Sequence, residues 1–139
     1  MLTADIKRKI DKCQEYLEKL SVYTVLARDE ILGSEEKRLA MERLFLLTGD
    51  EAVDINAALA YQLGGRIPET QKSTFAELVP LHILETDFAE KIAGSVKIRN
   101  QMTHDYEKIQ HAELIDLMNK FAEMYKTYIR ILVKKFVSQ

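Results

Sequence analysis

The 139-residue chain contains one cysteine, two prolines, five glycines and no tryptophan. With Cys13 alone, one chain can form neither an intramolecular disulfide nor a cysteine-based metal cage. So few prolines and glycines argue against a turn-rich all-β protein, whereas Leu, Ala, Glu, Lys and Ile are abundant, as long helices prefer. The sequence therefore predicts an all-α protein.

Long hydrophobic runs and a strong net charge are also missing. No apolar run approaches the roughly 20 residues that span a bilayer, and the stretch MLTADIKRKID is charged throughout. We therefore expect a cytoplasmic protein with no membrane contact. The formal net charge of −2 argues against nucleic-acid binding by the whole surface, because counterion release needs clustered Lys and Arg. Any RNA contact has to be local.

The first half of the chain shows helical periodicity. Thr3 is a plausible N-cap, and the helix that follows should end near Ser21. A short helical piece over 24–32 stops at Gly33, and Ser34 opens a long helix to Leu63, which Gly64 and Gly65 terminate. The first helix shows one apolar stripe, formed by Ile6, Ile10, Cys13, Leu17 and Leu20.

The long second helix carries two unusual features. Gly49 lies in its middle at a cost of about 1 kcal/mol against Ala, which favours a close helix contact or a bend. Glu51 and Asp54 border the buried face. That face is predicted to consist of Met41, Leu44, Leu47, Ala52, Ile55 and Leu59.

The second half reads as a loop followed by two long helices. RIPETQKST is the main loop, a short helix with Phe75, Leu78 and Val79 precedes Pro80, and the next helix starts at Thr86 or Asp87. Its Gly94 permits close approach of a neighbour. Its inner faces carry Phe88, Ile92, Ser95 or Val96, and Arg99, and the last helix has a stripe of Leu114, Met118, Phe121, Tyr125, Tyr128, Leu132 and Phe136. We expect a single domain over 1–139, an antiparallel bundle of four to five helices.

Reactive side chains gather in KIRNQMTHDYEKI, residues 97–109, which holds Arg99, Asn100, His104 and Tyr106. On a continuous α-helix a five-residue step turns about 140°, so Arg99 and His104 would face different sides. They can converge if the helix frays near Met102 or Thr103 and the chain then runs extended, where positions two apart project the same way. The segment is predicted to straddle a helix end.

This pattern, Arg-Asn, three further residues, then His-x-Tyr, resembles the signature of the HEPN ribonucleases in the form carried by HepT toxins. The resemblance covers most of the chain. The helix with ERLFLLTGDEAVDI is similar to the family's corresponding helix, whose acidic pair matches Glu51 and Asp54. The Pro68-Glu69 loop also has a family counterpart, so the resemblance implies a HEPN-like bundle.

The resemblance implies RNA cleavage without a metal or cofactor, in which the ribose 2′-hydroxyl attacks the adjacent phosphate. His104 would move the proton, Arg99 would hold the phosphate and Asn100 would orient the substrate. Glu51 and Asp54 either hold Arg99 through charged hydrogen bonds or are solvated acids. A single histidine supplies only half of the acid and base work, and the resemblance implies a homodimer that brings two motifs to one cleft. Its interface should use the helix ending near Arg99 and the turn after it.

Regulation also follows from the resemblance. HepT toxins belong to type VII toxin–antitoxin pairs, in which an MNT-type nucleotidyltransferase attaches AMP to the signature tyrosine, here Tyr106. The added phosphate would block the place of an RNA phosphate by charge and bulk. We therefore expect RNA and an MNT antitoxin as partners.

Two other readings stay open. The first is a non-catalytic HEPN module that binds a nucleotide or docks a nucleotidyltransferase, and the second is an inert helical scaffold. His82 and His111 have no partner at metal-ligand spacing, and Tyr125 and Tyr128 read as core. The last helix also has a basic side, formed by Lys120, Lys126, Arg130, Lys134 and Lys135. We interpret it as a solvated face, with binding of the RNA backbone as the weaker alternative.

Overall fold

The computed structural model describes residues 2–64, 66, 68–71 and 73–137, and in these ranges it contains helices and no strand. The α-helices are α1 (Ala4–Thr24), α2 (Arg28–Leu32), α3 (Glu35–Gln62), α4 (Ser73–Glu77), α5 (Thr86–His104) and α6 (His111–Leu132). A 3₁₀ turn covers Tyr106–Lys108 and a π-helical segment covers Val133–Val137. The all-α prediction is confirmed, with four long helices and two of five residues each.

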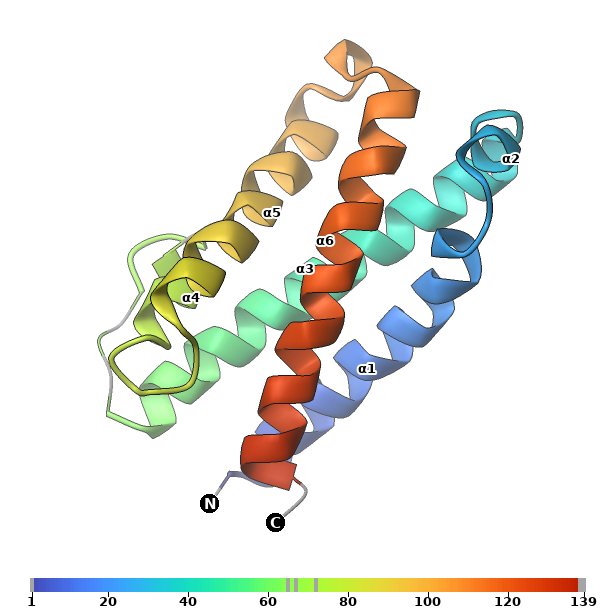
Figure 1. Ribbon diagram of the computed structural model, residues 1–139. Coiled ribbons are helices and arrows are strands. Elements are labelled where there is room, and N and C mark those ends of the chain that lie inside the picture. The colour runs from blue at the N-terminus through green and yellow to red at the C-terminus, as the bar shows by residue number, and fades with distance from the viewer. Residues whose placement is uncertain (1, 65, 67, 72, 138–139) are drawn as a thin grey trace.

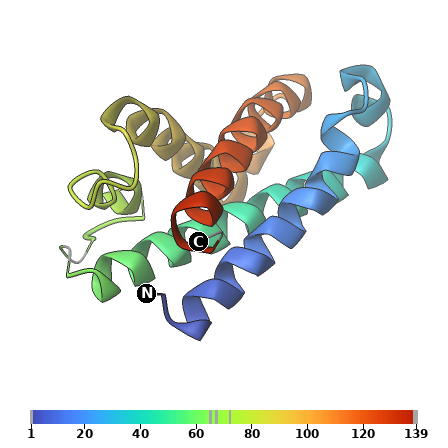
Figure 2. The same cartoon turned by 60° about the horizontal axis from the view of Figure 1, so that its bottom comes forward.

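The long helices form two antiparallel pairs (Figure 1). α1 and α3 lie side by side and make the most extensive interface, and α6 contacts both of them. α5 packs against α6 and α3, so the second pair lies on the first, as Figure 2 shows. The end of α5 and the 3₁₀ turn therefore come to lie near the first half of α3.

Helix starts and the first stripe agree with the sequence. Thr3 Oγ1 accepts a hydrogen bond from the Ile6 backbone N–H at 3.3 Å, and Ser34 Oγ accepts one from Lys37 at 3.2 Å. Such caps satisfy backbone donors that a helix start leaves unpaired. The stripe predicted for the first helix is buried, namely Ile6, Ile10, Cys13, Leu17 and Leu20.

The predicted buried face of α3 is wrong in part. Leu44 and Leu47 are only half-buried. The reason is that α1, α2, α4, α5 and α6 all contact α3, so its buried positions do not form a single stripe. Besides the predicted Met41, Ala52, Ile55 and Leu59, the buried set includes Glu42, Phe45, Thr48, Gly49, Val53, Asn56 and Ala60.

Two glycines mark close approaches between helices, as their positions predicted. The Arg99 side chain lies over Gly49, where an added Cβ would come within 2.9 Å of Arg99 Cζ and nearer still to Cδ and Nε. At Gly94 an added Cβ would lie 3.2 Å from Phe121 Cζ, which lets α5 approach α6. Gly64 has φ +75° after the end of α3, and Gly65 lies outside the described residues.

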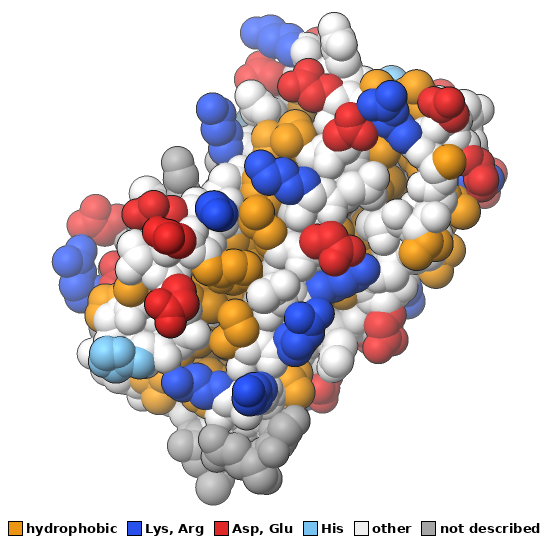
Figure 3. Space-filling model, in the orientation of Figure 1, with side chains coloured by type: hydrophobic (Ala, Val, Ile, Leu, Met, Phe, Trp, Pro, Cys, Tyr) orange, Lys and Arg blue, Asp and Glu red, His pale blue; other side chains and the backbone are white. Residues whose placement is uncertain are grey.

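The tyrosines of α6 are core, as predicted. Tyr125 and Tyr128 are fully buried, and the Tyr128 hydroxyl donates to the Asn56 side chain. On the outside, hydrophobic side chains form a band between scattered charges of both signs on the face in Figure 3. Within the part of the chain that the structure describes, none of the helices combines the length and apolarity needed to cross a bilayer.

Candidate functional site

The signature segment straddles the end of α5, as predicted. His104 is the last residue of α5, and Tyr106 begins the 3₁₀ turn. The Asp105 backbone N–H donates to Gln101 O at 2.8 Å, and Thr103 Oγ1 donates to Arg99 O at 3.0 Å. The helix therefore continues through Met102 and Thr103. The fraying and the extended run that convergence within one chain would require are absent from these described residues.

Arg99 points into the protein. It is 5% exposed, its side chain crosses Gly49, and its Nη2 makes an ion pair with Asp50. Its Nε and Nη1 are buried and have no hydrogen-bond partner among the described residues. A guanidinium has five N–H donors, so this buried cation is only partly satisfied.

The acid beside Arg99 is not one of the two that the sequence suggested. Asp50 is paired with Arg99, whereas Glu51 faces α1 and Asp54 is exposed. Burial, followed by the charges of Asp54 and Asp50, raises the pKa of Glu51, and Lys9 opposes that shift. One helix position turns about 100°, so Asp50 faces α5 while Glu51 faces elsewhere. The neighbouring Gly49 was the signal for this contact in the sequence.

His104 and Asn100 lie on the outside of α5. Both side chains are exposed, and the His104 side chain makes no hydrogen bond or ion pair within the described ranges. Asn100 lines a pocket of about 510 Å³ with Thr70, Gln71, Val96 and Lys97. In one chain Arg99 and His104 therefore face different directions, as expected for five residues along a continuous helix.

Tyr106 turns from the 3₁₀ turn back onto α3. Its hydroxyl donates to Glu42 Oε2 at 3.0 Å, and its ring lies 6.0 Å from the ring of His111. The extended arrangement that would have pointed His104 and Tyr106 the same way is thus absent, because Tyr106 is half-buried and His104 is exposed.

Glu42 is the acid that sequence reasoning missed. It is 7% exposed, and burial raises its pKa, while the Tyr106 hydrogen bond and the charges of His111 and Arg38 oppose that shift. Burial and then Glu42 itself raise the pKa of Tyr106. Nothing in the sequence separates Glu42 from the other acids of α3, because its burial depends on the turn that brings Tyr106 over it.

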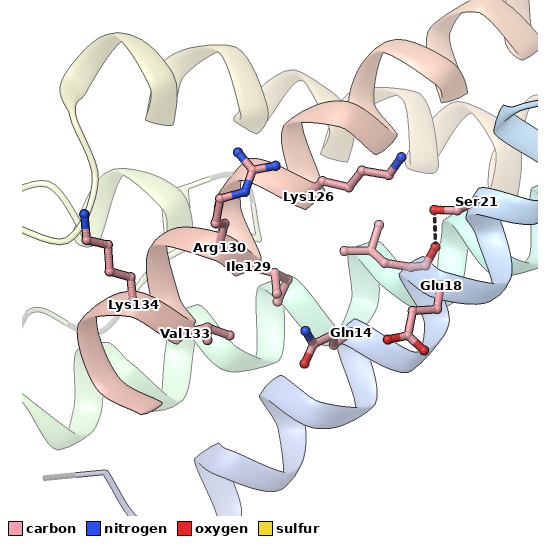
Figure 4. A pocket seen from close by; sticks show the side chains of 9 residues that line it. Gln14, Glu18, Ser21, Lys126, Ile129, Arg130, Val133 and Lys134 are labelled. Atoms are coloured by element: carbon pink, nitrogen blue, oxygen red, sulfur yellow. Dashed lines mark hydrogen bonds between the residues drawn. The ribbon is translucent and has the colours of Figure 1, made fainter. Parts of the chain in front are cut away.

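The remaining candidates lie away from this segment. His82 is exposed with φ 60°. Lys126, Arg130 and Lys134 line a pocket of about 490 Å³ between α1 and α6, which Figure 4 shows from close by. Fifteen residues separate Lys126 from the start of α6, about 22 Å along a helix, so this pocket is remote from the signature. No cluster of three His, Cys, Asp or Glu residues suited to a metal occurs in the described part of the chain.

Comparison with known proteins gives consistent matches. Residues 13–132 match the family model described as Ribonuclease HepT-like. The tRNA nuclease HepT of Aphanizomenon flos-aquae is 29% identical over 125 residues, which are 90% of this chain and 85% of that protein.

Two solved structures share the fold. One is a tri-AMPylated HEPN toxin of Shewanella oneidensis in complex with an MNT antitoxin, with a TM-score of 0.83, 14% identity, and coverage of 96% of this chain and 99% of that one. The other is a toxin–antitoxin solved with AMP-PNP, with a TM-score of 0.81, 13% identity, and coverage of 94% and 99%. At these identities the likeness concerns the arrangement of helices.

Proposed function

Because this chain belongs to the Ribonuclease HepT-like family, we propose that it is the endoribonuclease toxin of a type VII toxin–antitoxin pair. The observation that carries this proposal is the family match over residues 13–132, which includes the whole segment from Arg99 to Tyr106. A relative is named a tRNA nuclease, so transfer RNA is the first substrate to test.

In this proposal His104 moves the proton. Histidine titrates near neutral pH, so it can take the proton of the ribose 2′-hydroxyl or return one to the leaving oxygen. The exposed ring at the end of α5 has no protein partner in the described ranges, so both ring nitrogens remain available to RNA. Asn100, exposed one helix position after Arg99, would contact the substrate beside it.

Arg99 would stabilise the charge on the phosphate. Although the side chain is buried, its Nη2 pairs with Asp50, whose side chain is 60% exposed, so this end of the guanidinium lies near the surface. An RNA phosphate that displaces Asp50 would gain a permanently charged donor aimed at it. Nε and Nη1 have no competing acceptor within the described residues. These groups can act without a metal ion.

Two copies of the chain are needed because each supplies one signature histidine. The proposed homodimer brings the ends of two α5 helices to one cleft, so that groups which diverge within one chain come from both chains. The exposed positions of His104 and Asn100 on α5 are compatible with such a cleft.

Silencing by AMP is the last part of the proposal. The structurally similar Shewanella oneidensis toxin is tri-AMPylated in its complex with an MNT antitoxin. Here Tyr106 follows His104 by two residues, and an adenylyl phosphate on it would add negative charge where the RNA backbone has to approach.

The test is cleavage of transfer RNA by purified protein in the presence of EDTA. We expect His104→Ala and Arg99→Ala to lose cleavage, whereas His82→Ala, the matched change of another exposed histidine, keeps it. Light scattering should show a dimer for wild type and for His104→Ala. Equal cleavage by wild type and His104→Ala would reject the assigned site.

The burial of Arg99 favours a second candidate, a non-catalytic module that binds a nucleotide or docks a nucleotidyltransferase. A guanidinium held by Asp50 inside the chain can be purely structural. This candidate predicts tight binding of the partner enzyme or ATP and no RNA cleavage at any protein concentration.

A further inference from the structure

The contact between Tyr106 and Glu42 is unusual because the acid is the more buried partner. Glu42 is 7% exposed, whereas Tyr106 is half-buried and comes from a turn at the surface. The Tyr106 hydroxyl donates to Glu42 Oε2 at 3.0 Å. An ionised carboxylate away from water is costly without hydrogen bonds, and this phenol is the hydrogen-bond donor that the structure gives it.

We infer that Glu42 is the proton acceptor for Tyr106 when this tyrosine is adenylylated. The inference rests on the proposed function, in which Tyr106 takes AMP from ATP. In the transfer, a bond forms between Tyr106 Oη and the α-phosphorus, and the bond from that phosphorus to the β-phosphate oxygen breaks. Pyrophosphate leaves, and the phenolic proton moves to Glu42 Oε2.

A base is needed because the phenol holds its proton tightly. The ordinary tyrosine pKa of 10.0 is raised here by burial and by Glu42, so the phenolate is scarce at neutral pH. Proton removal therefore has to accompany attack, which is the situation in which general base catalysis is effective. The hydrogen bond already has the heavy-atom separation that proton transfer requires.

Glu42 is suited to this task by its surroundings. Burial raises its pKa and so makes it a better proton acceptor than an exposed glutamate. The charged groups around the pair are Arg38 and Glu35 on α3 and His111 at the start of α6. Arg38 and His111 favour the ionised carboxylate, which has to be present before transfer.

Modification also ends the contact. The oxygen of an aryl phosphate ester carries no proton, so the modified Tyr106 cannot donate to Glu42. The new phosphate brings negative charge toward a buried acid, which disfavours the docked position. The modified side chain would therefore leave α3 and extend toward the end of α5, where His104 lies.

The experiment measures AMP incorporation by intact mass, with the full 139-residue chain, ATP and a purified MNT-type nucleotidyltransferase. Glu42→Gln keeps the shape and a hydrogen-bond acceptor but cannot take the proton. Glu107→Gln is the matched control, because it removes the same charge from an exposed residue next to Tyr106. Tyr106→Phe tests the attachment site.

We expect Glu42→Gln to lower the initial rate by about 100-fold or more, with Glu107→Gln within about twofold of wild type. The wild-type rate should fall as pH falls through the pKa of Glu42, and the residual rate of Glu42→Gln should lack that fall. Glu42→Asp retains a proton acceptor and should recover part of the rate, which also covers the case in which Glu42→Gln folds poorly.

The other outcomes separate the two claims. In one outcome the wild type is modified at Tyr106, and Glu42→Gln reacts as fast as Glu107→Gln. That result overturns the role of Glu42 and leaves the proposed regulation intact. In another outcome, Glu42→Gln and Glu42→Asp slow AMP incorporation equally and both keep the pH profile of the wild type. That result assigns Glu42 a structural role and overturns the inference. Wild type that takes no AMP on Tyr106 overturns both claims.

Discussion

The two ends of the signature segment are both held on α3 by an acid, yet in opposite ways. Arg99 is buried and its partner Asp50 is 60% exposed, whereas Glu42 is buried and its partner Tyr106 lies at a surface turn. The two acids are eight positions apart, about 12 Å along a helix. At the Arg99 end the buried group has a fixed charge, and at the Tyr106 end it is the acid that can change its charge. The first contact is therefore suited to positioning and the second to proton transfer.

His104 lies between Arg99 and Tyr106 in the sequence, and neither of the two acids of α3 makes a hydrogen bond with its side chain. Replacing it should have the largest effect on RNA cleavage. His104→Ala should lower RNA cleavage by about 10²–10⁴-fold, the usual contribution of a general acid or base. Because the side chain is exposed, the free energy of unfolding should change by no more than about 0.5 kcal/mol. Cleavage rates and urea denaturation check this pair of results. A large loss of stability would instead make His104 part of the scaffold.

Asp50→Asn tests the Arg99 end directly. It leaves a buried guanidinium without its anion, so the free energy of unfolding should fall by about 1–3 kcal/mol. Asp54→Asn removes the same charge one turn further along α3 from an exposed position and should change little. Thermal and urea unfolding of the two variants would show the contrast. Equal stabilities would mean that the Arg99 contact is weak.

The effect of Gly49→Ala on the free energy of unfolding should change sign with the residue at position 99. In wild type the new Cβ would come within 2.9 Å of Arg99 Cζ, so overpacking should cost about 1–3 kcal/mol. In an Arg99→Ala background the obstacle is gone, and alanine should stabilise the helix by up to about 1 kcal/mol. The measurement is a double-mutant cycle of urea denaturation. A loss of the same size in both backgrounds would place the obstacle elsewhere.

The smallest expected effect on stability comes from the contact between Tyr106 and Glu42. It is a pH dependence of the free energy of unfolding. Burial raises the pKa of Glu42 above 4.5, so between 4.5 and the folded-state pKa the folded protein binds more protons than the unfolded chain. Stability should therefore rise as pH falls through that window. The difference in unfolding free energy between wild type and Glu42→Gln should show this slope. Glu107→Gln, which removes the same charge from an exposed position, is the control.

Local pattern predicted the helices well and their contacts less well. The stripe from Ile6 to Leu20, the cap at Ser34 and the buried tyrosines of α6 follow from spacing, because each depends on neighbours three or four positions away. The buried face of α3 could not be read in the same way, since several helices cover it from different directions. Gly49 predicted a close contact between helices, but the sequence did not identify Arg99 as the side chain that makes it.

The sequence by itself determined the all-α class, the order of the long helices and the signature from Arg99 to Tyr106, because periodicity, caps and motif spacing are local properties. Only the tertiary structure decided that Arg99 is turned inward onto Asp50, that His104 remains exposed and that Tyr106 reaches Glu42. These contacts join positions 49 and 64 residues apart. Which acid of α3 meets which signature residue depends on the rotation and height at which α5 and its turn pack, and no local spacing encodes that geometry.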